Sequence, residues 1–451
     1  MTHPQGKILL SICISLLILA LLSYPTWAQD ELPPPGQPLT LDQCITIALK
    51  FQPSLRGSAA SIEAAKARVE QALSAYYPQV NWNTSYSTTT LNYGVGSSAG
   101  NVISSGSSGR NRYSGVFTDV SASQIALNQT LYDFGRTANA VRINKENTAV
   151  SEGDFSITRQ AVILNVQQAY YSVLQTLRLI QVAEDTVGQN QKRLEQAQGF
   201  YQAGTRPKID VTNAEVNMAN TELSLIIARN NYQVARVTLN NALGLRQDLN
   251  FAIEDSLAFK RREITLEEIL QKAYDLRPEL SQIKARERAQ EATIKLAQSS
   301  YYPVLSGNAS YTYRTPDYNY YMWDWFFGAS LSFPLFSGFS TPNQIAEAKA
   351  NLRNLQAQEE NLMLSIRLEA QQAYLAMRQA DERIRVTEKQ ISQAQENFEL
   401  ATGRYQVGVG FPLEVTDAEV SRANARANYI QALADYKIAE ARIEKAMGQT
   451  R

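Results

Sequence analysis

The stretch YYPQVNWNTSYS, from Tyr76 to Ser87, decides the fold because a second version of it, YYPVLSGNASYT, runs from Tyr301 to Thr312. The two stretches are 225 positions apart. Other matches keep this spacing without a gap: Thr40 and Leu41 with Thr265 and Leu266, Pro53 with Pro278, and Tyr86 with Tyr311. Self-similarity at such a long period predicts tandem structural repeats.

The later part of each copy repeats at a shorter spacing of 204 residues. The hexapeptide VTNAEV, which begins at Val211, returns as VTDAEV from Val415. The first copy therefore carries 21 extra residues, the difference between the two spacings, between Tyr86 and Leu127. The Gly/Ser-rich segment 94–115 predicts that these residues form a long loop.

The two copies define the expected domains. Repeat 1 spans 39–245 and repeat 2 spans 264–449, with a connector at 246–263 between them. Ahead of repeat 1, a lysine, an apolar run that is short for a membrane span and a small residue near its end predict a signal peptide at 1–28. A proline-rich linker at 29–38 follows it.

Several kinds of chemistry are excluded by the composition of the expected mature chain. Cleavage of the signal peptide removes His3, the single histidine, and Cys13, so that Cys44 is the remaining cysteine. The mature chain then has no disulfide of its own, no histidine base and no Cys/His metal cluster, and we expect no cofactor and no metal. The chain has 43 acidic and 43 basic residues, so its net charge does not favour binding to nucleic acid.

Alternating side chains predict two strands in each repeat, at about 78–131 and 303–335. The larger side chains after Pro78 occupy every second position: Val80, Trp82, Thr84 and Tyr86. Gln, Asn and Ser lie between them, and repeat 2 shows the same alternation. A soluble sandwich alternates in the same way. However, a polar face of Ser and Asn, with aromatic residues around the second loop, better fits a membrane barrel with a wet lumen and an aromatic girdle.

Each repeat is expected to begin with one helix ahead of its strands, and after the strands it continues into a long helix, a turn and a further helix. The long helix of repeat 1 is expected from just after Asp133 to about Tyr201, which is about 100 Å at 1.5 Å per residue. Larger residues recur at every seventh position, and smaller ones follow three residues later, which predicts coiled-coil seams. The larger positions are Val166, Val173, Ile180, Val187, Leu194 and Tyr201 in repeat 1, and Ala370, Met377, Ile384, Ile391, Phe398 and Tyr405 in repeat 2. An isolated soluble coiled coil would explain this seam but not the strands.

Four strands per chain cannot close a transmembrane barrel, which needs at least about 8. An open edge in lipid leaves backbone groups unpaired, so the predicted barrel must be shared between chains. The predicted fold class is an α+β membrane protein, built from two tandem structural repeats. It combines a shared antiparallel transmembrane β-barrel, with four strands per chain, and a long α-helical coiled-coil tunnel.

Several motifs in duplicate resemble those of TolC-type outer-membrane efflux proteins, the outer membrane factor family. They are TLDQCITIAL from Thr40 and TLEEILQKAY from Thr265, LYDFG from Leu131, and the turns YQAG from Tyr201 and YQVG from Tyr405. The resemblance covers 39–448 and implies a homotrimer in contact with outer-membrane lipid, with four strands from each chain in one barrel. It also implies a helical tunnel in the periplasm, with the turns near Gly204 and Gly408 at its inner tip.

The function that the resemblance implies is a passive exit duct for small molecules or proteins, in a tripartite efflux or type I secretion system. A periplasmic adaptor, or membrane fusion protein, would join the duct to an inner-membrane transporter. The sequence has no Walker-type loop, so the energy would come from that transporter. The alternative is a non-conducting trimeric stalk, structural or adhesive, of the cell envelope. An enzyme is not predicted, because a helical chain of this charge content contains carboxylate pairs by chance.

The two turns are the predicted docking site for the adaptor, since the end of an extended hairpin is accessible to a partner. The docking residues are Gly204, Thr205, Arg206, Gly408, Val409 and Gly410. Pro207 and Pro412 beside glycines are also ordinary turn chemistry between antiparallel helices.

A latch at the closed tip is implied by the resemblance. Tyr405 matches a family tyrosine and Asp210 matches its carboxylate partner, which predicts a hydrogen bond between them. Gly410 stands where the family has an arginine, which puts the salt-bridge half of the latch in doubt. The alternative is that Tyr405 only continues the heptad seam.

An acidic ring at the pore entrance is the last prediction about the tip. Glu414 and Asp417 are three residues apart and therefore on one face of a helix. The resemblance implies that repeat 2 lines the pore entrance, where matching positions in the family carry acidic rings. Threefold symmetry would then gather six carboxylates at a constriction that favours cations. The alternative is that both residues complement the dipole of the helix that begins there.

Overall fold

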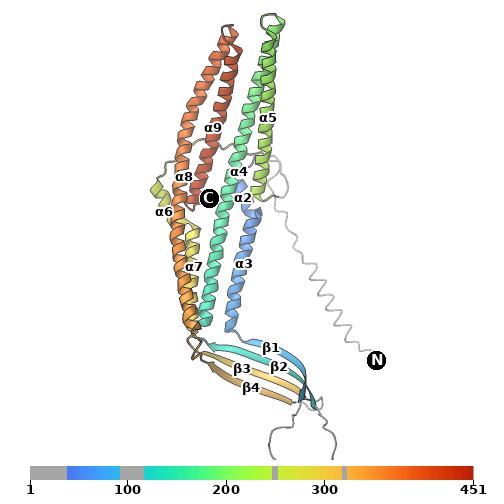
Figure 1. Cartoon of the computed structure of the whole chain (residues 1–451), viewed down its shortest axis with the longest axis vertical. Coiled ribbons are helices and arrows are strands. Elements are labelled where there is room, and N and C mark those ends of the chain that lie inside the picture. Colours follow the sequence, from blue (N-terminus) through green and yellow to red (C-terminus); the bar gives the residue numbers. More distant parts are fainter. Residues whose placement is uncertain (1–37, 92–115, 246–251, 317–321, 450–451) are drawn as a thin grey trace, which may run out of the picture.

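The computed structural model describes residues 38–91, 116–245, 252–316 and 322–449. The predicted signal peptide, nearly all of the linker and the loop 94–115 lie outside these residues. The molecule is elongated, with long helices at one end and a small sheet at the other (Figure 1). None of the helices in the described ranges combines the length and the apolarity that a membrane crossing requires.

The described elements follow the same order in both halves of the chain. The first half contains α2 (Leu41–Phe51), α3 (Pro53–Leu73), the short 3₁₀ helix η1 (Ser74–Tyr76), β1 (Gln79–Leu91), β2 (Val116–Tyr132), α4 (Arg136–Gln202) and α5 (Lys208–Leu243). The second half contains α6 (Leu266–Leu276), α7 (Pro278–Ser299), β3 (Val304–Pro316), β4 (Met322–Ser332), α8 (Ser340–Gln406) and α9 (Pro412–Ala446).

A single helix was expected at the start of each repeat, and the structure has two. Pro53 and Pro278 each take the first turn of the second helix, where the missing N–H is not needed. The residue before a proline avoids the α region, so Gln52 and Arg277 are extended and separate the helices. The first helix of each pair begins at a threonine cap, Thr40 or Thr265.

The four strands form one antiparallel sheet in the order β1-β2-β3-β4. Strand β2 of repeat 1 pairs with β3 of repeat 2, so both repeats build the same sheet. One register row crosses all four strands through Trp82, Ile125, Tyr311 and Trp325, with larger side chains throughout. The adjacent row is polar and contains Asn83, Gln124, Thr312 and Asp324. The sheet therefore has one apolar and one polar surface over this part.

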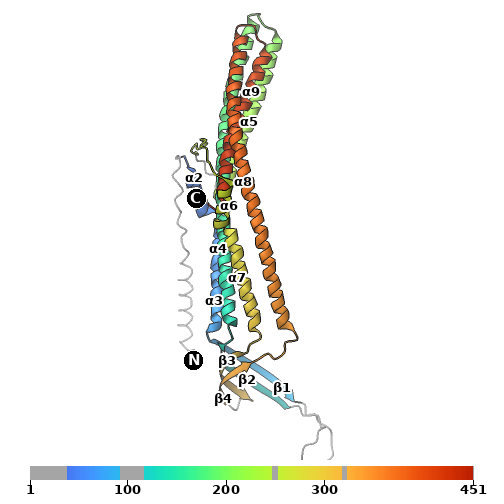
Figure 2. The same cartoon turned by 90° about the vertical axis from the view of Figure 1, so that its left-hand side faces the viewer.

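The long helices pack as two antiparallel hairpins, α4 with α5 and α8 with α9, whose turns lie at the end of the molecule opposite to the sheet (Figure 2). The predicted seam of α8 is buried at Ala370, Met377 and Ile384, which are all less than a tenth exposed, and half-buried at the three later positions up to Tyr405. In α4 the burial is complete at Val166 and Val173 but decreases toward the turn, and Tyr201 is 46% exposed.

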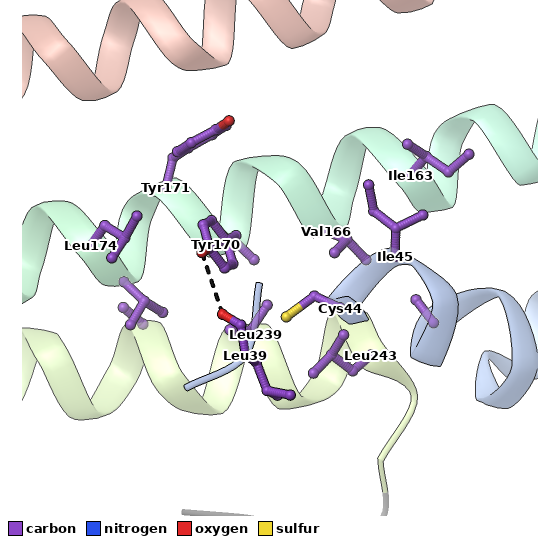
Figure 3. Close-up of a cluster of buried hydrophobic side chains, with 14 of the residues drawn as sticks. Leu39, Cys44, Ile45, Ile163, Val166, Tyr170, Tyr171, Leu174, Leu239 and Leu243 are labelled. Atoms are coloured by element: carbon purple, nitrogen blue, oxygen red, sulfur yellow. Dashed lines mark hydrogen bonds between the residues drawn. The ribbon is translucent and has the colours of Figure 1, made fainter. Parts of the chain in front are cut away.

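The largest buried cluster lies midway along the helices, where α2 packs on α4 and α5 (Figure 3). Cys44 is free and buried there, and burial raises the pKa of its thiol to about 12. The hydroxyl of Tyr170 donates a 2.7 Å hydrogen bond to the carbonyl oxygen of Glu254. The connector pairs with the start of repeat 1 through a parallel bridge between Leu39 and Ile253. This cluster holds the hairpin of repeat 1 to the short helices.

Candidate functional site at the helical tip

The tip consists of the two turns that connect α4 to α5 and α8 to α9. Gly204 and Gly408 adopt φ angles of +72° and +82°, a conformation that favours glycine. The chain reverses tightly after each helix: the N–H of Thr205 donates to the carbonyl of Phe200, and that of Val409 donates to the carbonyl of Arg404. Two equivalent glycine turns therefore lie at the end of the molecule that is far from the sheet (Figure 1).

Most of the predicted docking residues lie on the surface of the tip. Gly204, Thr205, Gly408 and Val409 are exposed, and Arg206 is half-buried. Gly410 is buried. A Cβ atom at Gly410 would lie 2.8 Å from the backbone nitrogen of Tyr405 and 2.9 Å from the carbonyl carbon of Arg404. A side chain at Gly410 would therefore clash with the backbone of the turn, which gives this glycine a structural role there.

The predicted latch residues Tyr405 and Asp210 line one cavity of about 540 Å³ between the two hairpins. No hydrogen bond joins them within one chain among the residues that the structure describes. The ring of Tyr405 instead packs edge-to-face against Phe200, with centroids 6.4 Å apart, and the Arg206 guanidinium lies 5.5 Å from its centre. Burial raises the pKa of the Tyr405 hydroxyl, Arg206 acts to lower it, and the nearby Asp210 carboxylate adds to the increase.

The two predicted ring residues lie at the start of α9. Glu414 is half-buried, and its carboxylate is 3.9 Å from the guanidinium of Arg404. Asp417 is exposed. In a single chain, Glu414 thus complements both the first turn of α9 and a cation at the end of α8.

A buried charge cluster near the tip was not predicted from the sequence. Glu419 of α9 is 2% exposed, and its carboxylate contacts the Arg193 guanidinium of α4 at 2.5 Å. The side-chain amide of Asn190 donates a 3.2 Å hydrogen bond to the same carboxylate oxygen. Arg422, also buried, lies 3.8 Å from the centre of the Phe398 ring in α8. The cluster therefore connects both hairpins through α4, α8 and α9.

Burial dominates the electrostatics of this cluster. It raises the pKa of Glu419, although Arg193 and Arg422 act to lower it. Burial likewise lowers the pKa of Arg193 and Arg422. A signal for the cluster does exist in the sequence, because Val415, Ala418, Glu419, Arg422 and Ala425 recur at helical spacing, which places two charged residues on an apolar stripe.

Comparison with known proteins connects this architecture to one family. A family model described as "Outer membrane efflux protein" matches residues 44–245 and 269–449. The outer membrane protein TolC of Escherichia coli (strain K12) is 22% identical over 422 residues, which cover 88% of this chain and 79% of TolC. The protein CyaE of Bordetella pertussis (strain Tohama I) is 23% identical over 411 residues, which cover 88% of this chain and 82% of CyaE.

Solved structures show the same fold at lower identity. The outer-membrane channel OprN aligns with a TM-score of 0.76 at 19% identity, over 91% of this chain and 90% of the OprN chain. The CusC structure aligns with a TM-score of 0.75 at 18% identity, over 91% of this chain and 92% of that chain. Helical hairpins ending in a small sheet are thus common to these proteins.

Proposed function

This chain belongs to the outer membrane efflux protein family, and from that premise we propose that it is the exit duct of a tripartite efflux or type I secretion system. Its relatives are channel proteins of the outer membrane rather than enzymes, and this chain is an outer-membrane channel with a helical part in the periplasm. The proposal adds that the duct is a passive homotrimer, which receives small molecules or proteins from an inner-membrane transporter through a periplasmic adaptor.

The observation that carries the proposal is the incompleteness of one chain. Strands β1 and β4 are the edges of the sheet, and neither has a further strand partner within the described residues. Aromatic side chains on the sheet are also uncovered: Trp82, Trp325 and Phe327 are 74%, 62% and 76% exposed. Pairing of β1 with β4 of a neighbouring chain would satisfy both edges, and a lipid environment would cover the aromatic surface.

The helices carry a second uncovered surface. More than half of the surface is exposed at seven apolar positions of α5: Ile209, Val216, Leu223, Ile226, Ile227, Val234 and Val237. The same holds for five apolar positions of α8: Leu364, Leu368, Leu375, Val386 and Leu400. Contiguous apolar stripes of this length usually mark an interface. We infer that α5 of one chain packs along α8 of the next, which closes the helices into a tunnel.

Conduction is the property that distinguishes a duct from the alternative, a non-conducting stalk. The purified protein, shown by light scattering to contain three chains, is inserted into a planar lipid bilayer. Stepwise ohmic current is the expected result. A trimer that inserts, as judged by protease protection of its sheet, but carries no current would favour the stalk.

The adaptor is proposed to dock on the exposed residues of the two turns. A photo-crosslinking amino acid at Thr205 or Val409 should capture a periplasmic protein in intact cells. Glu63, which is exposed on α3, is the matched control and should capture none. A pattern of capture that is the same at all three positions would contradict docking at the tip.

Closure of the tip is proposed to involve the two remaining predicted sites. A hydrogen bond between Tyr405 and Asp210 would form as the hairpins adjust in the trimer, since both side chains already border one cavity. Glu414 and Asp417 from three chains would form an acidic ring at the entrance. Both proposals rest on the resemblance to the family and on the position of these residues beside the turns.

A further inference from the structure

In repeat 1, an extended segment of the connector lies beside the residue that precedes α2. The N–H of Leu39 donates a 2.9 Å hydrogen bond to the carbonyl of Ala252, and the N–H of Glu254 donates a 3.1 Å bond to the carbonyl of Leu39. Tyr170 of α4 is completely buried beneath this pair, and its hydroxyl lies 3.4 Å from the carbonyl oxygen of Leu39 (Figure 3). The connector therefore covers Tyr170 and adds a strand-like segment to repeat 1.

Two side chains fix this segment, which has the sequence AIEDSL from Ala252 to Leu257. Asp255 binds the Arg178 guanidinium of α4 in a bidentate ion pair, with N–O distances of 3.0 and 2.9 Å. Leu257 is 1% exposed and belongs to the same buried cluster as Tyr170. The segment that closes repeat 1 thus combines backbone pairing, a carboxylate opposite an arginine and a buried apolar side chain.

Repeat 2 contains the same receiving positions, but no described segment of the chain pairs with them. Ile264 is the counterpart of Leu39 at the spacing of 225, and Tyr374 is the counterpart of Tyr170 at the spacing of 204. Neither the N–H nor the carbonyl of Ile264 forms a hydrogen bond within the described ranges. Tyr374 is half-buried. The helices that follow, α2 and α6, lie at a similar level of the molecule (Figure 1), so equivalent places are compared.

A cavity of about 490 Å³ adjoins these two positions of repeat 2. We call it the connector groove, and its lining includes Ile264, Tyr374, Met377, Arg378 and Asp381. The Oδ2 atom of Asp381 lies 3.1 Å from the Arg385 guanidinium, whereas Oδ1 is buried and has no hydrogen-bond partner among the described residues. A buried acceptor without a donor costs free energy. An N–H of an added peptide would satisfy this oxygen.

Arg378 is the cation of the groove that an acidic residue can reach. The whole lining carries four arginines and four carboxylates, so it is the position of Arg378 and not the net charge that selects such a residue. Arg378 lies one turn after Tyr374, and Arg178 likewise follows Tyr170 along its helix. Its ion pair with Glu382, at 3.6 Å, is exposed. Exposed pairs contribute little to stability and can be replaced.

The groove lies beside the chain interface proposed above rather than in it. Leu375 belongs to the apolar stripe of α8 that we assign to the neighbouring chain, and Tyr374 precedes it. Successive residues are about 100° apart around a helix, since a turn contains 3.6 residues. The two surfaces therefore face different directions, and assembly of the duct does not by itself fill the groove.

We propose that the connector groove binds an extended acidic peptide segment of a partner protein, which adds to Ile264 as segment 252–257 adds to Leu39. The peptide backbone pairs with the N–H and carbonyl of Ile264, its acidic residue pairs with Arg378, and its apolar side chain lies against Tyr374. This inference goes beyond the proposed function, because it concerns a surface of one chain and not the conduction path.

Fluorescence anisotropy with a labelled synthetic peptide tests the groove. The probe FAIEDSLAF copies residues 251–259 of this chain and should bind the purified full-length protein saturably. Arg378→Glu should weaken binding at least about tenfold. Arg353→Glu, at an exposed position of α8 closer to the sheet, is the matched control and should bind like the parent.

Two altered probes test the mode of binding on the parent protein. A probe with proline at the position of Glu254 lacks the N–H that pairs in repeat 1, and it should bind at least about tenfold more weakly. A probe with a benzophenone amino acid at the position of Leu257 should crosslink to Tyr374 or Met377, as identified by mass spectrometry.

The remaining outcomes contradict the proposal. Equal affinity in the parent and Arg378→Glu, or crosslinks confined to repeat 1, would show that the probe exchanges with the connector or binds elsewhere. Binding that requires removal of residues 29–37 would show that this chain already fills its own groove, which excludes a partner. A parent protein without saturable binding would overturn peptide recognition. Current through the planar bilayer is independent of all these results, so failure of the groove is distinguishable from failure of the duct.

Discussion

Two roles are predicted for Tyr405, packing through its ring and a latch through its hydroxyl. It occupies a position of the heptad seam, and it also borders the cavity that contains Asp210. Its ring contacts Phe200 and Arg206, and it also packs against the apolar cluster of Ala401, Val415 and Ala418. The ring accounts for the packing of this residue, and the predicted latch would be a separate role of the hydroxyl.

Replacing Tyr405 with Phe tests the latch. The substitution keeps the ring contacts and removes the hydroxyl, so a hydrogen bond to the Asp210 carboxylate would lose about 1.5 to 3 kcal/mol of closed-state stabilisation. We expect higher resting conductance in single-channel recordings. Tyr201→Phe, at the exposed counterpart in repeat 1, is the control. Equal conductance for Tyr405→Phe and the parent would leave Tyr405 with packing alone.

At the scale of the elements, glycines at helix ends determine where the chain can reverse. Gly244 ends α5 with a φ of +75°, and a Cβ there would lie 2.8 Å from the Cα of Gln52. This residue therefore meets two constraints, a left-handed conformation and close contact with the junction of α2 and α3. Gly188 lies inside α4 with open space around it and meets neither constraint.

Alanine at these two glycines should have opposite effects on stability. Gly244→Ala should lower the free energy of unfolding by about 1 to 3 kcal/mol because of strain at the left-handed position and the contact with Gln52. Gly188→Ala should raise it by about 0.5 to 1 kcal/mol, because alanine loses less conformational entropy in a helix. Thermal unfolding followed by circular dichroism measures both. Stabilisation of the chain by Gly244→Ala would show that this junction relaxes freely.

A second junction, between α6, α7 and the later helices, depends on charge. Arg277, which is 4% exposed, contacts the carboxylate of Glu369 in α8 at 2.6 Å. Lys445 of α9 contacts the same carboxylate at 3.1 Å. Burial acts to raise the pKa of Glu369, but the two cations outweigh burial and lower it. The ion pairs therefore hold the junction of α6 and α7 to α8 and α9 in the charged state.

The lowered pKa predicts how stability changes with pH. A carboxylate with a depressed pKa stabilises the fold above its unfolded-state pKa of about 4.3, and this contribution is lost as the pH falls through the lower folded-state value. Glu369→Gln should therefore unfold at a lower temperature than the parent at pH 7, and the difference should decrease below about pH 4.3. Glu382→Gln, in an exposed pair with Arg378, should have little effect at either pH. A difference for Glu369→Gln that is constant with pH would rule out this linkage.

At the scale of the whole molecule, the proposed duct requires several chains. One chain supplies a sheet with two open edges and helices with uncovered apolar stripes. It also supplies two carboxylates, Glu414 and Asp417, whose spacing around a pore axis depends on the number of copies. In one chain, the carboxylate of Glu414 already lies near the guanidinium of Arg404. A cation bound by the ring would therefore compete with Arg404 for this carboxylate.

Block by a trivalent cation tests the ring. Six carboxylates in a narrow entrance should bind such a cation tightly, so the parent channel should close at low concentrations of hexaamminecobalt(III). In the variant Glu414→Ala/Asp417→Ala, the concentration for half block should rise at least about tenfold, which corresponds to about 1.4 kcal/mol of binding free energy. Glu399→Ala, at an exposed position of α8, is the control. Equally tight block in parent and double variant would leave Glu414 and Asp417 with a role at the helix start alone.

The sequence by itself determined the repeat, the alternation of the strands and the extent of the long helices. These features are periodic. A period of two, of seven or of about two hundred residues can be recognised in the sequence without knowledge of any tertiary contact. The helix ends can also be recognised in the sequence, because the helices begin near prolines or threonines and the chain reverses at glycines. The break at Pro53 and Pro278 was missed although its cause is local, because apolar periodicity continues across it.

Only the tertiary structure decided which repeated residues carry a special role. The same three residues, Ala-Glu-Val, follow the start of the last helix in both repeats, yet Glu215 is exposed and Glu419 is 2% exposed. The difference arises because Arg193 and Asn190, more than two hundred positions away, lie against Glu419 of α9, whereas Glu215 of α5 has no such ion pair within the described part of the chain. Burial of a charge depends on its neighbours in space, and local sequence does not contain them.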